Sequence, residues 1–410
     1  MSSVSPTFFR REYARLVAGL SRRFGVEVLE LAEDAASTAL LRAVETWPRS
    51  GEPRNPSAWL WTVAHNALTG ELRTRGNRAR LLASQAGTEP SLEPSPRVRL
   101  GSEIDDDQLR MLFVCCDPAL AIEAQLALAL KTLCGLSVAE IAQRTFSGEA
   151  AVYKRLARAR KQLNAQGRER IFEAGLESLR RRRPAVQATL YLLFTEGHLS
   201  THPELAIRRE LCSEAIRLGV MLARHEVGDP ASSALVALMF LHRARLSART
   251  GEGGGLLLLS EQDRSAWNPD DIAEGMCWLA ASASGDALTR YHLEAGIAAE
   301  HAMAPSFEAT DWERIATLYE QLEVVSRSPL HRLNRALALA QWRGAEAGLE
   351  LVRDRAPPTW LEGSVLWSAT LADLCRRAGE ANEAARWRAA ALASAPSEAV
   401  RELLLRRLVK

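Results

Sequence analysis

One stretch decides the fold of this chain: Leu136-Ser-Val-Ala-Glu-Ile-Ala-Gln-Arg144, then a short turn, then Glu149-Ala-Ala-Val-Tyr-Lys-Arg-Leu-Ala-Arg-Ala-Arg-Lys-Gln-Leu163. The first segment opens with Ser137 and Glu140, which have the spacing of a capping box at a helix N-terminus. The second segment opens with an acidic residue and then mixes apolar residues and cations at helical spacing. Two helices joined by a tight turn are therefore predicted.

Both helices have an apolar side, and the second has a basic one. The predicted inner side is formed by Ile141, Ala142, Val152, Leu156 and Ala159. The opposite side of the second helix carries Tyr153, Lys154, Arg155, Arg158, Arg160 and Lys161. This pattern predicts a helix-turn-helix, whose second helix enters the DNA major groove with its N-terminal turn while flanking cations meet phosphates. The alternative is a solvated basic face on an ordinary helical hairpin.

The rest of the chain is also predicted to be helical, because Ala, Leu, Arg and Glu dominate and alternating β-type runs are scarce. Three prolines and a glycine make Trp47–Pro56 a loop, and Ser57 is predicted to cap a helix that begins at Ala58. A basic run meets a proline at Arg180–Pro184, which predicts a boundary. The expected organisation is a first helical domain at 8–80, a Ser/Pro/Gly-rich flexible linker at 81–104, the helix-turn-helix domain at 105–167 and a helical extension at 184–410.

Charge divides the chain into two parts. Residues 1–183 carry 28 Lys/Arg against 21 Asp/Glu, a net +7, and residues 184–410 carry 24 against 29, a net −5. A basic first part and an acidic second part indicate different binding partners for the two.

The end of the chain contains a weak repeat. Gly379, Ala384, Ala391 and Pro396 lie where a tetratricopeptide helical hairpin needs small residues and a terminating proline. A similar hairpin is predicted over Leu333–Arg355. A tetratricopeptide-like stack is therefore expected, with a generic helical bundle as the alternative.

Composition and motifs point away from catalysis. No phosphate-binding, dinucleotide-binding, zinc-protease or serine-hydrolase motif occurs, so no enzyme activity, metal or cofactor is expected. The six cysteines, expected to be buried free thiols, are Cys115, Cys116, Cys134, Cys212, Cys277 and Cys375. The N-terminus has no signal-peptide core and no apolar run is long enough to cross a bilayer. A cytoplasmic protein without membrane contact is expected.

The helix-turn-helix resembles region 4 of a bacterial RNA polymerase sigma factor, which has the pattern L-S-x-x-E-I-A, a turn, and V-x-x-R-L-x-R-A-R. Leu136, Ser137, Glu140 and the run from Val152 to Arg160 fit this pattern. In that family the domain reads the −35 promoter element. The resemblance assigns −35 contacts to Glu149, Ala150, Tyr153, Lys154, Arg155, Arg158 and Arg160.

The first domain resembles sigma region 2. Leu31-Ala-Glu-Asp34 through Trp47 is similar to the helix that binds the clamp helices of the polymerase largest subunit. Asn55-Pro-Ser-Ala-Trp-Leu-Trp-Thr-Val-Ala-His-Asn66 and Glu71-Leu-Arg73 are similar to the helix that melts and reads the −10 element, where aromatic and basic side chains suit unstacked bases. Polymerase contacts are thus implied for Leu31, Asp34, Leu41 and Trp47. The implied −10 contacts are Asn55, Trp59, His65, Asn66, Arg73 and Arg75. For Trp59, the spacing with Val63 also fits a buried stripe.

The extension resembles the C-terminal domain of one extracytoplasmic-function (ECF) sigma subgroup, on stretches such as Leu193-Phe-Thr-Glu-Gly-His198 and Leu211–Leu218. The resemblance implies an all-α protein with region 2, region 4 and a tetratricopeptide-like extension. It implies a sigma factor that binds core RNA polymerase through the β′ clamp helices and the β flap, directs it to promoter DNA and initiates transcription. The extension is expected to regulate this activity with a regulatory protein or ligand as its partner.

Two other functions stay open. A tetratricopeptide scaffold that has lost polymerase binding is one, supported by Ser37, Thr38 and Gly70, which depart from the usual sigma residues. An enzyme that uses acidic and histidine residues of the extension is the other. Several polar residues there lie inside apolar patterns, and they form either a satisfied buried network or an effector pocket. They are Glu196, His198, His242, Arg243, Asp263 and Arg264.

Overall fold

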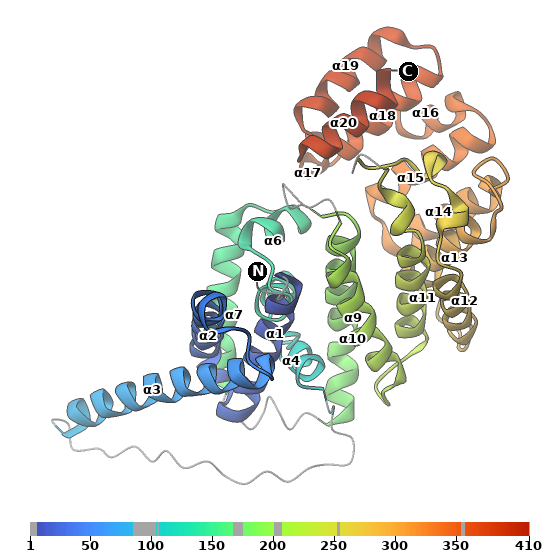
Figure 1. The fold of residues 1–410 in the computed structure, drawn as a ribbon. Helices are drawn as coiled ribbons and strands as arrows, with labels where there is room; N and C mark the ends of the chain where they lie inside the picture. Colours follow the sequence, from blue (N-terminus) through green and yellow to red (C-terminus); the bar gives the residue numbers. More distant parts are fainter. Residues whose placement is uncertain are drawn as a thin grey trace. The chain divides into compact units, whose positions relative to one another are not determined.

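The computed structural model describes residues 6–84, 104, 106–166, 175–200, 207–251, 255–353 and 357–409. Within these ranges the chain is helical without a named β-strand, and Thr250 and Leu256 form one isolated bridge. The prediction of an all-α protein is confirmed (Figure 1). The predicted linker lies mostly outside the described residues. Contacts divide the chain into two compact units, residues 1–189 with 225–227 and residues 190–224 with 228–410.

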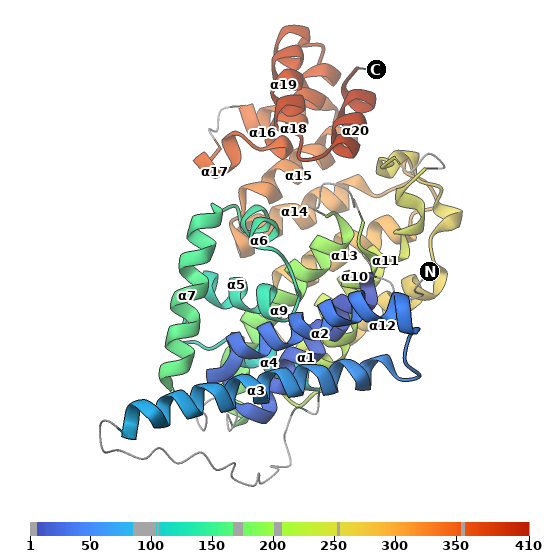
Figure 2. The same cartoon turned by 60° about the vertical axis from the view of Figure 1, so that its left-hand side comes forward.

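The first unit begins with three helices, α1 (Pro6–Phe24), α2 (Leu29–Ser50) and α3 (Pro56–Ser84). Figure 2 shows α2 and α3 lying side by side, and both pack on α1. Leu60, Ala64 and Leu68 on α3 are fully buried at four-residue steps, which is the inner stripe of an amphipathic helix. Aromatic rings close one end of this core, where the rings of Phe9 and Trp47 stack with centroids 5.9 Å apart.

Two local predictions for this part were wrong. Helix α2 continues through Pro48 to Ser50, so the loop begins at Gly51 rather than at Trp47. A proline in the last turn is tolerated there because the helix ends within one turn and the carbonyl that it leaves unbonded faces solvent. The cap of α3 is Asn55, whose side-chain oxygen accepts from Ala58 N at 3.0 Å. Proline at the first helical position needs no N–H partner, which favours a start at Pro56.

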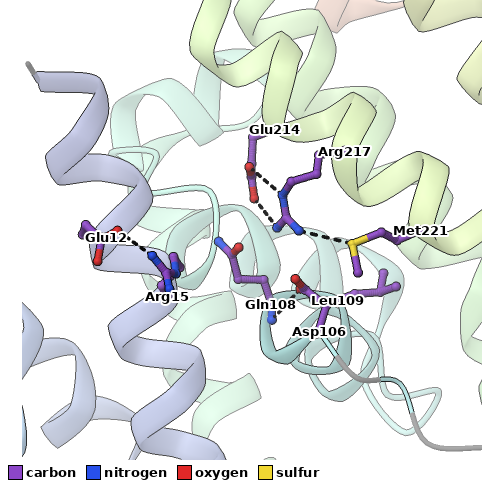
Figure 3. A network of polar contacts seen from close by, with 8 residues as sticks. All are labelled: Glu12, Arg15, Asp106, Gln108, Leu109, Glu214, Arg217 and Met221. Atoms are coloured by element: carbon purple, nitrogen blue, oxygen red, sulfur yellow. Dashed lines mark hydrogen bonds and ion pairs between the residues drawn. The ribbon is translucent and has the colours of Figure 1, made fainter. Parts of the chain in front are cut away.

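Four helices follow in the first unit, α4 (Asp107–Cys115), α5 (Ile122–Thr132), α6 (Val138–Arg144) and α7 (Glu149–Gln166). Asp106 caps α4, accepting from Gln108 N at 3.0 Å and from Leu109 N at 2.9 Å (Figure 3). The predicted capping box of α6 is confirmed, since Ser137 and Glu140 bond to each other's backbone N–H. The predicted inner residues are at most 4% exposed, which confirms the helix-turn-helix pattern.

Helix α9 (Leu176–His198) starts in the first unit, and the division between the units falls inside it, after Thr189. The sequence predicts a boundary at Arg180–Pro184, whereas the structure continues the helix through Pro184. Pro184 and Arg180 are both exposed, so the Arg180 carbonyl that loses its helical partner faces water.

The second unit is a chain of helices in which consecutive members pack on one another. Figure 3 shows a local group of contacts in α10 (Arg209–Arg224). Arg217 donates to both carboxylate oxygens of Glu214, at 3.0 and 2.7 Å, and its Nη1 lies 3.2 Å from the sulfur of Met221. The helices are α10 (Arg209–Arg224), α11 (Pro230–Ala244), α12 (Pro269–Ala281), α13 (Arg290–Met303), α14 (Trp312–Ser326), α15 (Pro329–Trp342), α16 (Ala345–Arg353), α17 (Thr359–Glu362), α18 (Val365–Arg377), α19 (Ala381–Ala393) and α20 (Glu398–Val409).

Two of these pairs, α15 with α16 and α18 with α19, are joined by tight turns. Gly344 and Gly379 occupy the turns with φ of 97° and 82°, a left-handed conformation that strains any residue with a Cβ atom. Ala391, predicted as a small contact residue, is completely buried. These two hairpins agree with the predicted repeat. The assignment of the whole unit to the tetratricopeptide class stays a prediction.

Candidate nucleic-acid interface

The outer face of α7 presents most of the residues predicted to contact the −35 element. Glu149, Ala150, Tyr153, Lys154 and Arg158 are exposed. Arg155 is half-buried beside the inner stripe. Because the exposed residues gather on the first half of α7, this part of the helix has the shape and charge to enter a major groove.

Arg160 differs from the other predicted −35 residues, because its guanidinium is held inside the first unit. Its Nη2 lies 2.5 Å from Oε2 of Glu33 on α2, and its Nη1 lies 3.8 Å from Oε1 of Glu30. The Glu33 side chain is only 12% exposed and also accepts from the hydroxyl of Thr132 on α5, at 2.8 Å. Arg160 is therefore not available to a DNA phosphate while this contact persists.

Burial affects the pKa of the Glu33 carboxyl group in this contact. Burial raises the pKa of Glu33 above its ordinary value, and the nearby guanidinium of Arg160 opposes that rise. A second ion pair also joins helices of the first unit. Arg22 on α1 lies 2.6 Å from Asp107 on α4. Ion pairs thus join α1 to α4 and α2 to α7, and the Thr132 hydrogen bond joins α2 to α5.

The predicted −10 residues occupy different environments on and before α3. Asn66 and Arg73 are exposed on the face that also carries Thr62, a residue that the sequence analysis did not single out. Arg75 is exposed and pairs with Glu71 at 3.0 Å. Thr62 and Asn66 are four residues apart, so they lie on the same face of a helix. This spacing identifies the face once the register of α3 is known.

The other three −10 candidates have structural contacts. The side chain of Asn55 caps α3. The Trp59 ring is half-buried against Trp47, with centroids 5.4 Å apart, and the His65 ring lies 5.5 Å from that of Phe24. Leu60, not Trp59, belongs to the fully buried stripe. Trp59 and His65 therefore flank the core and keep part of their surface toward solvent.

The polymerase-contact candidates on α2 divide into exposed and buried residues. Asp34 is exposed and Leu41 is 60% exposed, although it is apolar. Leu31 and Trp47 are 9% and 4% exposed. A direct polymerase contact predicted for Leu31 and Trp47 disagrees with their burial, because their side chains fill the core beneath α2. Val44 is 55% exposed, and with Leu41 it gives α2 an apolar surface patch.

Most polar residues singled out in the extension hold neighbouring segments together. Arg243 makes two contacts with Asp271, at 2.5 and 2.8 Å. Glu196 accepts from Ser200 at 2.8 Å. Arg264 donates to the carbonyl of Ala304 at 2.8 Å, and Asp263 accepts from Ser265 N at 2.9 Å. The contacts of Glu196, Arg243 and Arg264 favour a satisfied network over an effector pocket at these three residues, whereas Asp263 is exposed.

The described residues contain no group of His, Cys, Asp and Glu that is arranged to hold a metal ion. No helix in the described part of the chain is long and apolar enough to cross a membrane. Of the predicted buried thiols, five are buried and Cys277 is exposed.

Family comparisons agree with the arrangement of the first unit. Residues 9–78 match the model of Sigma-70 region 2, and residues 112–163 match that of Sigma-70 region 4. A protein of Rhizobium meliloti (strain 1021) that is named as uncharacterized is 37% identical over 376 residues, 90% of this chain and 88% of that protein. The chain belongs to the sigma-70 family. Residues 182–283 of this sigma factor match a family of unknown function, DUF6596, which covers the first part of the extension. No solved structure matches the chain.

Membership of this family defines the general role of the protein. Sigma regions 2 and 4 bind core RNA polymerase and promoter DNA, and they act in promoter recognition and transcription initiation without catalysis of their own. This sigma factor has both regions in the first unit, followed by a helical C-terminal extension.

Proposed function

We propose that this protein is an ECF-type sigma factor whose tetratricopeptide-like extension regulates promoter recognition. The two matched sigma regions, residues 9–78 and 112–163, both lie in the first unit. The exposed first half of α7 reads the −35 element. The Thr62, Asn66 and Arg73 face of α3 contacts the −10 element, and the α2 patch around Asp34, Leu41 and Val44 binds the β′ clamp helices. The β flap is a further contact of region 4.

The observation that supports regulation is a buried ion pair at the start of the extension. Nη2 of Arg182 on α9 lies 2.6 Å from Oδ2 of Asp117, and the two side chains are 6% and 7% exposed. Nη1 of Arg182 also donates to the carbonyl of Phe113 at 3.0 Å. Removing one partner of such a pair leaves an uncompensated buried charge, at a cost of about 3–5 kcal/mol. The first residue matched to the extension family is thus part of the region 4 core.

This anchor argues against an independent appendage. Helix α9 continues without interruption from Arg182 past Thr189 to residues of the second unit. Since α9 contributes residues to both units, a regulatory protein or ligand that binds the extension can act on region 4 through this helix. The acidic net charge of the extension is complementary to the basic sigma regions, which gives it a second way to affect them.

Transcription assays on anchor variants test this proposal. The double variant Asp117→Asn/Arg182→Gln removes both charges and keeps the polar shapes, and we expect it to change transcription from the target promoter in either direction. The control is Arg180→Gln, since Arg180 is exposed and its pair with Glu177 is 3.8 Å long. A chain ending at Gly175 gives the same comparison without α9. Wild-type transcription by both the double variant and the shortened chain would remove the regulatory role of the extension.

A further inference from the structure

The second unit contains a pocket that no sigma function accounts for. Its volume is about 590 Å³, within the range of small-molecule sites, and it lies between the segment before α12 and helices α13 to α15, α18 and α20. One part of the wall is aromatic and includes Phe307, Trp312 and Tyr319. Another part is cationic and consists of Arg376, Arg377, Arg406 and Arg407. We call these two parts the aromatic wall and the arginine wall.

The arginine wall has more positive charge than its own carboxylates neutralise. Asp373 forms ion pairs with three guanidiniums, those of Arg376 at 3.3 Å, Arg407 at 3.2 Å and Arg377 at 3.7 Å. Arg406 lies 3.7 Å from Glu261, the other acidic residue of the lining. Four guanidiniums therefore face two carboxylates. Arg377 and Arg407 are half-buried whereas Arg376 and Arg406 are exposed, and the excess of positive charge over carboxylates favours an anion in the pocket.

Two further polar groups, His301 and Arg245, lie close to the aromatic wall. His301 lines the pocket, and its buried Nδ1 has no hydrogen-bond partner among the described residues. The charge of Arg245 is close enough to His301 and Tyr319 to affect the titration of both. Within the described ranges, no carboxylate forms an ion pair with Arg245 and no acceptor takes a hydrogen bond from its guanidinium. Arg245 thus adds a cation close to two residues of the pocket lining.

From this geometry we propose that the pocket binds a small organic molecule that has a flat ring and a head group with two negative charges. The ring packs against Trp312 and Tyr319, and the head group bridges Arg376 and Arg407. Guanidiniums bind phosphates and carboxylates in the same two-point manner, so an aryl phosphate monoester and an aromatic dicarboxylate share the required chemistry. The proposal concerns binding alone, and it stands whether or not the extension regulates transcription.

Titration of the full-length protein with defined probes tests the site. The probes are phenyl phosphate and phthalate, with inorganic phosphate and phenol as single-feature controls. We expect a ring-bearing dianion to bind at least about tenfold more tightly than inorganic phosphate, and phenol to bind most weakly. Preference for phenyl phosphate over phthalate indicates a phosphate ester as the natural ligand class, and the reverse order indicates a dicarboxylate.

Two variants locate the site. Arg376→Gln/Arg407→Gln should weaken binding of the preferred probe by about tenfold or more. The matched control is Arg386→Gln, because Arg386 pairs with Glu383 three residues away at 3.3 Å, as Arg376 does with Asp373, but does not line the pocket. We expect that control to bind like wild type.

A second measurement is independent of protein stability. The imidazole signals of His301, followed by nuclear magnetic resonance, should shift with the preferred probe, because this side chain lines the pocket and a bound ring and anion change its surroundings. Equal binding of all four probes, equal binding by the two Arg variants, or no response of His301 up to about 10 mM probe would overturn the proposal.

Discussion

Nη2 of Arg160 on α7 lies 2.5 Å from Oε2 of Glu33 on α2, so the helix with the proposed −35 surface is joined to the helix with the proposed polymerase-binding patch. Glu33 is also held by Thr132, at 2.8 Å, which fixes its carboxylate toward α7. The pair is local to the first unit and involves a cation that a DNA phosphate would otherwise attract. We therefore expect the contact between α2 and α7 to compete with DNA for Arg160.

The first prediction concerns this competition. Glu33→Gln keeps a hydrogen-bonding side chain but removes its charge, which frees Arg160 for phosphate. We expect tighter binding of −35 DNA and a plot of log affinity against log salt that is steeper by up to about one unit, since each phosphate contact contributes about 0.9. The control is Glu30→Gln, one turn away, because Glu30 is 3.8 Å from Arg160 and largely exposed. Equal salt dependence for wild type and Glu33→Gln would show that the pair does not limit DNA binding.

The second prediction compares cations on α7. Arg158 is exposed whereas Arg160 is paired, so Arg158→Ala should cost about 1–3 kcal/mol of −35 binding if it reads a base edge, and Arg160→Ala should cost less. Binding titrations at two salt concentrations measure both. The substitution Arg314→Ala on the extension is the matched surface control. If Arg160→Ala has the larger effect, the Glu33 pair is not present in the DNA-binding state.

The third prediction concerns the α2 patch. Leu41→Ser and Val44→Ser alter side chains that are 60% and 55% exposed, so we expect weaker association with core polymerase and a change in unfolding free energy within about 0.5 kcal/mol. Val324→Ser, which is exposed on α14, controls for the loss of an apolar surface residue. By contrast, Trp47→Ala removes a buried ring and should destabilise the protein by about 3–5 kcal/mol. Normal polymerase association of the doubly substituted, folded protein would exclude the patch as the contact.

Sequence patterns were sufficient where a local rule decides the structure. The Ser137–Glu140 capping box and the inner stripe of the helix-turn-helix are set by contacts within a few residues, and both were predicted correctly. The start of α3 was misplaced, because Ser57 and Asn55 are both good caps and only the proline between them decides.

Long-range pairing was not predictable from the same patterns. Glu33 and Arg160 are 127 residues apart, and each alone resembles an ordinary exposed charge on an amphipathic helix. Val44 fits an apolar stripe by spacing, and only the packing of neighbouring helices leaves it outside. The arginine wall combines residues from α18 and α20, which no sequence motif connects.

The fourth prediction is a pH dependence of the second unit. Burial, together with Arg245 and Arg264, lowers the pKa of His301 to about 3, so this imidazole stays neutral in the folded protein. The unfolded chain takes up a proton below about pH 6.5, and stability is therefore lost as pH falls from that value toward 3. At about pH 5 the loss is at most about 2 kcal/mol for this histidine.

Denaturant unfolding at about pH 7.5 and about pH 5 measures this loss. His301→Gln should lose less stability between the two pH values than wild type, because glutamine cannot take up the proton. An identical pH dependence of the two proteins would contradict a neutral buried His301.

The most direct test of the account is reconstitution with purified core RNA polymerase. The full-length protein should form a holoenzyme and open a promoter that carries its −10 and −35 elements. The Leu41→Ser/Val44→Ser variant should associate more weakly with the polymerase, while Val324→Ser behaves as wild type. A folded wild-type protein that does not associate with core polymerase at about micromolar concentration would contradict the assignment as a working sigma factor.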